Sequence, residues 1–529
     1  MSAVDESGLP ESPDATAPRG RAQTILRNFS SLALGKVLGD ACTFLFFVVV
    51  SRKFGREGIG LYSFAIAFTA FFAAFAEFGL YQLTVREVSR RRPETATYFG
   101  GVLTLRLGLT LATAGLLAAV TVVALPRDRW ATVLLIGAFQ LLNKLYDGFA
   151  AVYVAHERMT TAGALEFTLR AGTAVAGLLV IAAGGGLLAA LAMLPLANLI
   201  QSGVGYALVR RDFGRPRLEP SVAALRTLAR DAAPYTLSSI LYPLTQRTDV
   251  VVLGLLLTAS DAGVYNVAYR IIYLTFFLPF FGGLAVFPIA SRLYPHALDD
   301  LRRLYQRSIR VTVLLAIPAA AGVWLVAPDI IPLLFGPQFQ ESVLVLRILS
   351  PLLVLAAFEV VVGPFLTAID RQAQRTRAEW VAAAANVIGN LALVPAFRLH
   401  GSAVAALVSE TVMVALFLWY GRDLLRTALP WSRIAVAVLG VTAFLVPLEW
   451  GHPLPLWAEV PLAALIYIAV LSLFPAIRTD EGRLAVKMAL SSAGRSHDPS
   501  HPARVAGGSR SAAAPNATGP LDDSQPPQR

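Results

Sequence analysis

The sequence contains one cysteine, Cys42, and few charges for its 529 residues. A single cysteine excludes a disulfide within the chain and a metal site built from cysteines. The six histidines form no HExxH-like pair, so the sequence predicts no metal site and no cofactor. Asp, Glu, Lys and Arg make up 15% of the residues, against about a quarter in soluble globular chains. The chain therefore lacks the polar surface that a soluble protein needs.

Apolar residues are abundant instead. They account for 56% of the chain and are concentrated between the two polar ends. A helix needs about 20 mostly apolar residues to cross a bilayer. Charged loops, prolines and glycines divide the apolar region into fourteen such segments: 29–50, 60–80, 98–125, 130–154, 161–183, 187–209, 233–257, 264–290, 309–327, 343–368, 377–395, 401–420, 432–448 and 458–474. The sequence thus predicts an all-α integral membrane protein with about fourteen transmembrane helices in the lipid bilayer.

Arginines are distributed unevenly among the predicted loops. Even-numbered loops carry most of them, including Arg210, Arg211 and Arg215, whereas odd-numbered loops carry few, such as Arg52 and Arg129. Loops rich in Lys and Arg remain on the cytosolic side of a membrane. The pattern predicts a multi-pass protein of the plasma (inner) membrane with both termini cytosolic. The same pattern explains the net charge of +11 through membrane orientation, so the sequence predicts no nucleic acid partner.

The composition further predicts how the chain is divided. Segments 1–26 and 479–529 have too few large apolar residues to form a core and are predicted to be largely disordered cytosolic tails. Between them we predict an N-lobe of six helices over 27–215, a C-lobe of six helices over 216–425 and a C-terminal helix pair over 426–478.

Two motifs recur in the two predicted lobes. Gly60, Tyr62 and Ala65 match Gly263, Tyr265 and Ala268 at a constant offset. Glu157 and Arg158 match Asp370 and Arg371 at a slightly larger one. Because each repeat contains an even number of spans, the two lobes must have the same orientation in the membrane. The sequence predicts a parallel pseudo-twofold repeat.

Ionisable side chains at membrane depth usually face a bundle interior or a water-filled cavity, because exposure to lipid is costly. Three arginines lack an acidic residue three or four positions away and are predicted to line a central cavity: Arg106, Arg247 and Arg270. Guanidinium groups match phosphate oxygens, so these residues suit an anionic substrate. Lys36, Lys144 and Arg170 are predicted to add to the positive field. The acidic residues that suit an ion or an interhelical pair are Asp40, Asp147, Asp249, Glu359 and Glu410.

A purely structural reading of some charges stays open. Lys36 and Asp40, Lys144 and Asp147, and Glu166 and Arg170 each share a helix face, because they lie three or four positions apart. Such pairs can neutralise each other locally without a role in binding.

Four segments carry a family resemblance: residues 51–62 (SRKFGREGIGLY), 249–254 (DVVVLG), 262–270 (AGVYNVAYR) and 334–339 (LFGPQF). With them the chain resembles the Wzx-type oligosaccharide flippases, in the superfamily that also contains MATE exporters and lipid II flippases. The resemblance implies two six-helix lobes around a cavity that opens alternately to the two sides of the membrane. It also implies a polyprenyl-diphosphate-linked oligosaccharide as substrate. These motifs fix no functional residue.

The resulting hypothesis is a flippase for cell-surface polysaccharide biosynthesis, which performs no covalent chemistry and has glycosyltransferases and a polysaccharide polymerase as partners. The alternative is an ion-coupled multidrug or metabolite antiporter of the same fold, which requires essential carboxylates in the cavity. A membrane glycosyltransferase or polymerase requires catalytic carboxylates on a sizeable loop, and no predicted loop is long enough.

Overall fold

The computed structural model describes residues 18–219, 221–275, 286–287, 289–425, 431–450 and 455–473. All regular elements within these ranges are helices. The predicted tails lie outside the described residues, except that the first helix already begins at Pro18, inside the predicted N-terminal tail. Proline suits the first position of a helix because its φ is fixed near the helical value. Part of the predicted span 264–290 also lies outside the described residues.

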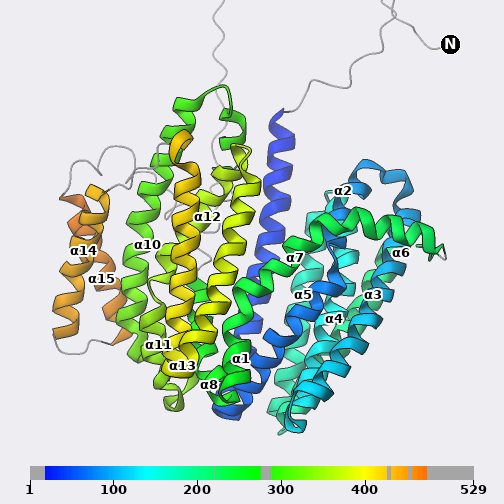
Figure 1. Cartoon of the computed structure of the whole chain (residues 1–529), viewed down its shortest axis with the longest axis horizontal. Helices are drawn as coiled ribbons and strands as arrows, with labels where there is room; N and C mark the ends of the chain where they lie inside the picture. The colour runs from blue at the N-terminus through cyan, green and yellow to red at the C-terminus, as the bar shows by residue number, and fades with distance from the viewer. Residues whose placement is uncertain are drawn as a thin grey trace, which may run out of the picture. The chain divides into compact units, whose positions relative to one another are not determined.

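Most of the described helices follow one another with short connections (Figure 1). They are α1 (Pro18–Glu77), α2 (Leu80–Arg90), η1 (Arg92–Glu94), α3 (Thr95–Ala124), α4 (Arg127–Ala155), α5 (Met159–Ala182), α6 (Leu187–Phe213), α7 (Val222–Leu256), α8 (Ala259–Thr275), α10 (Leu298–Phe335), η2 (Pro337–Phe339), α11 (Glu341–Leu349), α12 (Leu352–Ala368), α13 (Gln372–Leu425), α14 (Trp431–Trp450) and α15 (Leu456–Ser472). Each predicted span overlaps one of these helices, half of one or, for 343–368, two shorter helices. The predicted all-α membrane fold is confirmed.

Two long helices each contain two predicted spans. α1 bends at Gly55, where φ is 65°, and α13 bends at Arg398, where φ is 52°. Glycine adopts a positive φ without steric cost, whereas arginine does so only when its surroundings hold it there. Arg398 is held by an ion pair of 3.0 Å with Asp261 on α8. Both bends fall where the sequence predicts a short turn between spans.

Other boundaries differ from the prediction. α10 is 38 residues long and extends beyond the predicted span 309–327 at both ends. The predicted span 343–368 is divided into α11 and α12 at Pro351, because proline cannot donate the hydrogen bond that would continue the helix. α7 begins eleven residues earlier than predicted, and its start is capped by Ser221, whose hydroxyl accepts from the Ala224 amide at 3.3 Å.

The turns that follow α4 and α12 are the same. Glu157 and Asp370, which the sequence aligns as repeats, have φ values of 59° and 61°. The next residue in each turn, Arg158 or Arg371, donates its amide to the carbonyl five residues earlier at 2.9 and 2.8 Å. Each of these arginines also pairs with an aspartate at the end of the last helix of its lobe, Asp212 or Asp423, at 3.3 and 2.6 Å.

The two repeated glycines meet where α1 and α8 cross. A Cβ added at Gly60 would stand 1.7 Å from the Ala259 oxygen, and one added at Gly263 would stand 2.4 Å from the Arg56 oxygen. The contact is reciprocal, because Ala259 lies as far before Gly263 as Arg56 lies before Gly60. Reciprocal contacts are the mark of a twofold relation. The first half of α1 and the lower part of α7 also run in the same direction in Figure 1, as a parallel repeat requires.

The buried core distinguishes the two ends of the helix bundle. At the end that carries Gly55 and Arg398, here called the distal end, one continuous apolar core contains residues of both lobes, from Phe47 to Tyr265 and Phe335. At the opposite end, which carries the arginine-rich loops and is called the basic end, one core lies in the C-lobe and a second consists of N-lobe residues with Ala232 of the first part of α7. Apart from the first part of α7, which packs on the N-lobe, the lobes are joined at the distal end and have separate cores toward the basic end.

Three arginines in the otherwise arginine-poor loops connect the lobes at the distal end. Arg52 donates from Nε to the Leu334 carbonyl at 2.8 Å. Arg56 donates to the Gln338 carbonyl and forms an ion pair of 3.0 Å with Glu341. Arg129 donates to the Gly254 carbonyl at 2.5 Å. We call these three residues the distal clamp.

The last two helices pack beside the C-lobe. Phe444 of α14 and Tyr467 of α15 share a small apolar core with Leu325 of α10. The Tyr467 hydroxyl donates to the Leu314 carbonyl at 2.7 Å. This pair contributes no residue to the core that joins the lobes.

Candidate substrate cavity

A polar cavity of about 380 Å³ lies between the two lobes. Its charged lining consists of Lys36, Asp40, Lys144, Arg170, Arg247 and Arg270, contributed by α1, α4, α5, α7 and α8. Phe46 and Tyr62 belong both to the cavity wall and to the core shared by the lobes. That core closes the cavity toward the distal end. Five cations and one carboxylate therefore face a space at membrane depth.

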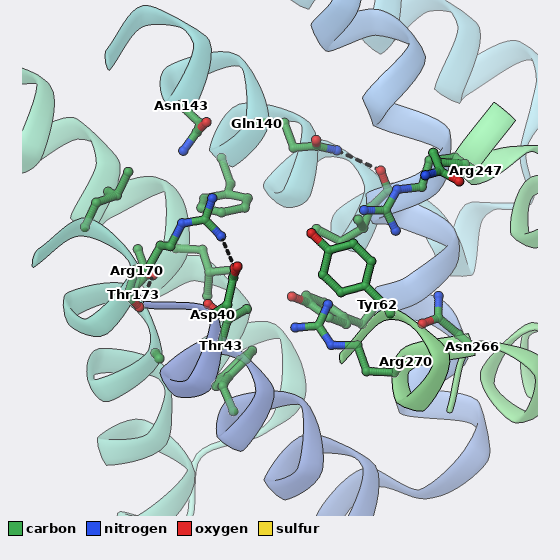
Figure 2. Close-up of a pocket in the computed structure, with 18 of the residues that line it drawn as sticks. Asp40, Thr43, Tyr62, Gln140, Asn143, Arg170, Thr173, Arg247, Asn266 and Arg270 are labelled. Atoms are coloured by element: carbon green, nitrogen blue, oxygen red, sulfur yellow. Dashed lines mark hydrogen bonds and ion pairs between the residues drawn. The ribbon is translucent and has the colours of Figure 1, made fainter. Parts of the chain in front are cut away.

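Two of the five cations are neutralised by carboxylates. Arg170 donates through Nη1 to Asp40 on α1 (Figure 2). It also donates through Nε to Glu166 at 2.6 Å. The Lys144 ammonium lies 2.9 Å from a carboxylate oxygen of Asp147. Gly39 leaves room for the first contact, because a Cβ there would stand 2.7 Å from the Arg170 side chain. For Arg170 and Lys144, the geometry therefore supports the purely structural alternative, in which neighbouring charges neutralise each other.

The remaining three cations have no carboxylate partner among the described residues. Asp40 binds Arg170 rather than Lys36, so the exposed Lys36 ammonium is left free. Arg247 and Arg270 lie on either side of Tyr62 (Figure 2). Arg270 stacks on Phe47 and Tyr273, with its guanidinium carbon 5.4 and 5.9 Å from the ring centroids, and its Nε is buried without a hydrogen-bond partner. Donors held in place by packing and left without an acceptor are suited to an anionic ligand.

Arg106 lies elsewhere. It is fully buried, and its Nη1 donates to the Lys144 carbonyl of α4. It does not line the cavity, so the prediction that it faces the cavity is wrong. A Cβ at Gly148 would stand 3.3 Å from the Arg106 Nε, and this close approach places the guanidinium between α3 and α4. Its acceptor is a main-chain carbonyl on the next helix, which the spacing of acidic residues along α3 cannot reveal.

Neutral polar residues, which the pattern of charges did not predict, also line the cavity. Gln140 and Asn143 of α4 line it with Lys144, and Gln246 and Asn266 line it from the C-lobe. Gln140 donates to the Ile66 carbonyl at 2.8 Å, which fixes its amide at the wall. The spacing of Gln140, Asn143, Lys144 and Asp147 places all four on one helix face, and this polar stripe was the available signal.

Asp249 is buried inside the C-lobe and does not face the cavity. Its carboxylate accepts from the Tyr265 hydroxyl at 2.6 Å and from the Asn390 amide at 2.7 Å. Ser402 donates to Asn390 at 2.7 Å and extends the network to the second half of α13. The interhelical pairing predicted as one option for Asp249 is therefore present.

Tyr265→Phe is expected to lower the free energy of unfolding by about 1–3 kcal/mol, because it removes a donor from a buried carboxylate. Thermal unfolding of the purified protein in detergent measures the effect. Tyr273→Phe, at a residue 39% exposed, serves as the control and should leave the unfolding temperature unchanged. Equal unfolding temperatures for both variants would show that the network does not stabilise the C-lobe.

Glu359 of α12 and Glu410 of α13 face each other within the C-lobe. Glu410 Oε1 is buried without a partner. Neither residue lines the cavity. In the part of the chain that the structure describes, no group of His, Cys, Asp and Glu is arranged to hold a metal ion.

The helical lobes and the cationic cavity between them define a multi-pass membrane transporter. The chain belongs to the polysaccharide biosynthesis protein family, whose family model matches residues 25–294. The MatE family model matches residues 234–395. Both the fold and the family are thus those that the sequence motifs predict.

Two relatives are similar to half or more of the chain. A probable low-salt glycan biosynthesis flippase, Agl15 of Haloferax volcanii, is 25% identical over 426 residues, which are 78% of this chain and 86% of that protein. A probable lipid II flippase, MurJ of Rhizobium meliloti, is 28% identical over 296 residues, which are 50% of this chain and 52% of that protein.

Solved structures share the fold. The lipid II flippase MurJ in an inward closed conformation matches with a TM-score of 0.70 at 12% identity, covering 85% of this chain and 98% of that one. A multidrug resistance MATE family transporter in an inward-facing conformation matches with a TM-score of 0.56 at 17% identity, covering 76% and 96%.

Proposed function

We propose that the protein is a flippase that moves a polyprenyl-diphosphate-linked oligosaccharide across the membrane for cell-surface polysaccharide biosynthesis. The observation that carries this proposal is the set of three cavity cations without carboxylate partners, Lys36, Arg247 and Arg270. The substrate's diphosphate is strongly anionic, and it is the group that these cations would bind. The named functions of the glycan and lipid II flippases among the relatives support the same substrate class.

The arrangement of the cores supports transport by alternating access. The structure is closed at the distal end by the shared core and the distal clamp. We infer that the basic end faces the cytosol, so that the cavity takes up substrate from the cytosolic leaflet. Charges at membrane depth interact strongly because the dielectric constant is low, and binding the diphosphate would compensate the repulsion among the cavity cations. Opening the distal end would then release the substrate outside.

We further propose the boundaries 27–215 for the N-lobe, 216–425 for the C-lobe and 426–478 for the helix pair. Both termini would be cytosolic and the membrane would be the plasma membrane. Glycosyltransferases would supply the substrate and a polysaccharide polymerase would take the product, since an oligosaccharide on a lipid must be assembled before export and joined afterwards.

The proposed orientation predicts the result of reporter fusions. A reporter fused after Arg217, in the connection from α6 to α7 at the basic end, is expected to be active in the cytosol. A reporter fused after Gln338, in η2 at the distal end, is expected to be active only outside. The reverse result would invert the orientation and with it the direction of transport.

Deletion of the gene tests the function itself. The expected result is loss of one surface polysaccharide and accumulation of its lipid-linked precursor on the cytosolic leaflet, restored by the wild-type gene. The antiporter alternative requires essential carboxylates in the cavity, where Asp40 is paired with Arg170, whereas Glu359 and Glu410 lie outside it. Increased drug sensitivity with normal surface polysaccharide would favour that alternative and exclude the flippase.

A further inference from the structure

A second cavity lies on the outer side of helices α3, α4 and α6. Its volume is about 1130 Å³, and it shares no lining residue with the central cavity. Drug-sized ligands occupy pockets of about 300–1,000 Å³, so this one has room for a long amphiphile. Its lining includes Leu103, Leu107, Leu145 and Phe149, and the connection from α6 to α7 closes it at the basic end. We call it the N-lobe groove.

The groove faces the bilayer. α3 and α6 lie at the edge of the helix bundle in Figure 1, and α3 exposes Leu111 and Val123 by 73% and 87%. The connection that covers the groove is held on α3 by its main chain. A Cβ at Gly100 would stand 1.9 Å from the Arg217 carbonyl oxygen, and the Glu219 amide donates to Thr104 at 2.9 Å.

Two arginines of this connection, Arg215 and Arg217, line the mouth of the groove. Both are exposed, and neither has an ion pair with any residue that the structure describes. Their neighbour Arg211 is instead paired with Asp212 at 2.8 Å. The positive charge at the mouth is therefore available to a ligand.

Deeper in the groove, the wall contains a polar group without a partner. Ser202 of α6 is 6% exposed, and its hydroxyl has no hydrogen-bond partner in the structure. Buried hydroxyls are normally paired, because an unpaired one loses its hydration without compensation. A ligand with an acceptor at this depth would satisfy it.

We propose that the N-lobe groove is a binding site for an anionic glycerophospholipid of the leaflet at the basic end. The phosphate binds Arg215 and Arg217, an ester oxygen accepts from Ser202, and one acyl chain follows Leu103, Leu107 and Phe149. The charged end of the lipid thus lies at the basic mouth of the groove, and its apolar chain lies along the apolar wall. Such a lipid would brace the connection between the two lobes. This site does not depend on which substrate the central cavity carries.

The test is native mass spectrometry of the full-length protein in detergent, titrated with dioleoylphosphatidylglycerol or dioleoylphosphatidylcholine. We expect tighter binding of phosphatidylglycerol. Arg215→Ala and Arg217→Ala should each weaken it about fivefold, as expected for a basic residue at a membrane surface. Lysine at both positions should restore most of the binding, because it keeps the charge. Arg210→Ala, at an exposed arginine outside the groove, is the matched control and should bind as the wild type does.

Ser202→Phe provides an independent variant, because it fills the groove and leaves both arginines in place. It should reduce phosphatidylglycerol binding without changing the elution volume of the protein. Equal affinity for the two lipids, or unchanged binding in the double alanine variant and in Ser202→Phe, would overturn the proposal. Displacement of phosphatidylglycerol by millimolar inorganic phosphate would likewise overturn it, since the site would then recognise a free anion.

Discussion

Replacing Arg247 and Arg270 together by alanine is expected to abolish export of the surface polysaccharide. Hydrogen bonds to charged groups contribute about 1.5–3 kcal/mol each, so each arginine lost should weaken diphosphate binding by about tenfold or more. Lysine at either position should give an intermediate defect, because an ammonium keeps the charge but not the forked geometry. The measurement is the amount of surface polysaccharide in a strain without the native gene, with each variant present at equal protein level.

Arg303→Ala is the matched control for this experiment. Arg303 lies at the basic end of α10, where it pairs with Asp300 at 2.5 Å and is well exposed. Surface ion pairs of this kind contribute about 0–1 kcal/mol, so export should remain normal. Normal export by the double alanine variant would contradict recognition of the diphosphate by these arginines, while a defect confined to that variant would support it.

Gly60→Val is expected to abolish export as well, by a different route. Any Cβ at this position would stand 1.7 Å from the Ala259 oxygen, so α1 and α8 would have to separate. Overpacking in a close contact costs about 1–3 kcal/mol or more. Here it would destabilise the distal end, where the two lobes are joined. The variant should therefore have a lower unfolding temperature in detergent, and Gly263→Val should resemble it because the contact is reciprocal.

Gly115→Val is the control, since a Cβ at Gly115 of α3 meets nothing within 4 Å. It introduces the same β-branched residue into a helix but touches no neighbour. Only the helix propensity changes, by a fraction of a kcal/mol or less. If Gly60→Val and Gly115→Val export equally well, the close contact between the lobes is not required for transport.

The spans were predictable because a bilayer imposes a length and a polarity on each crossing helix, and because loop arginines record the side. The continuity of the main chain from one span to the next could not be predicted. Nothing in the composition around Gly55 or Arg398 shows that two spans form one bent helix. The amphipathic helix α2, which follows α1, was missed because it does not cross the bilayer and so carries no long apolar run.

Part of the site could be predicted, because a charge at membrane depth costs free energy and the sequence shows which charged residues lie within the predicted spans. Lys36, Arg170, Arg247 and Arg270 do line the cavity. Periodicity along one helix cannot identify which neighbouring helix a side chain meets. That is why Arg106 was placed wrongly, and why the Asp40 to Arg170 contact between α1 and α5 was not foreseen. Which of these residues bind substrate remains a prediction.

The acceptors of the distal clamp determine how strongly the contact between the lobes depends on pH and on salt. Arg52 and Arg129 donate to main-chain carbonyls, and Arg56 donates to one as well as to Glu341. A carbonyl oxygen does not titrate, and as a dipole it is screened by salt much less than a carboxylate is. In the proposed orientation, in which the distal end faces outward, the seal between the lobes should thus hold through acidification or a rise in salinity outside the cell, and only Arg56 would lose one of its contacts.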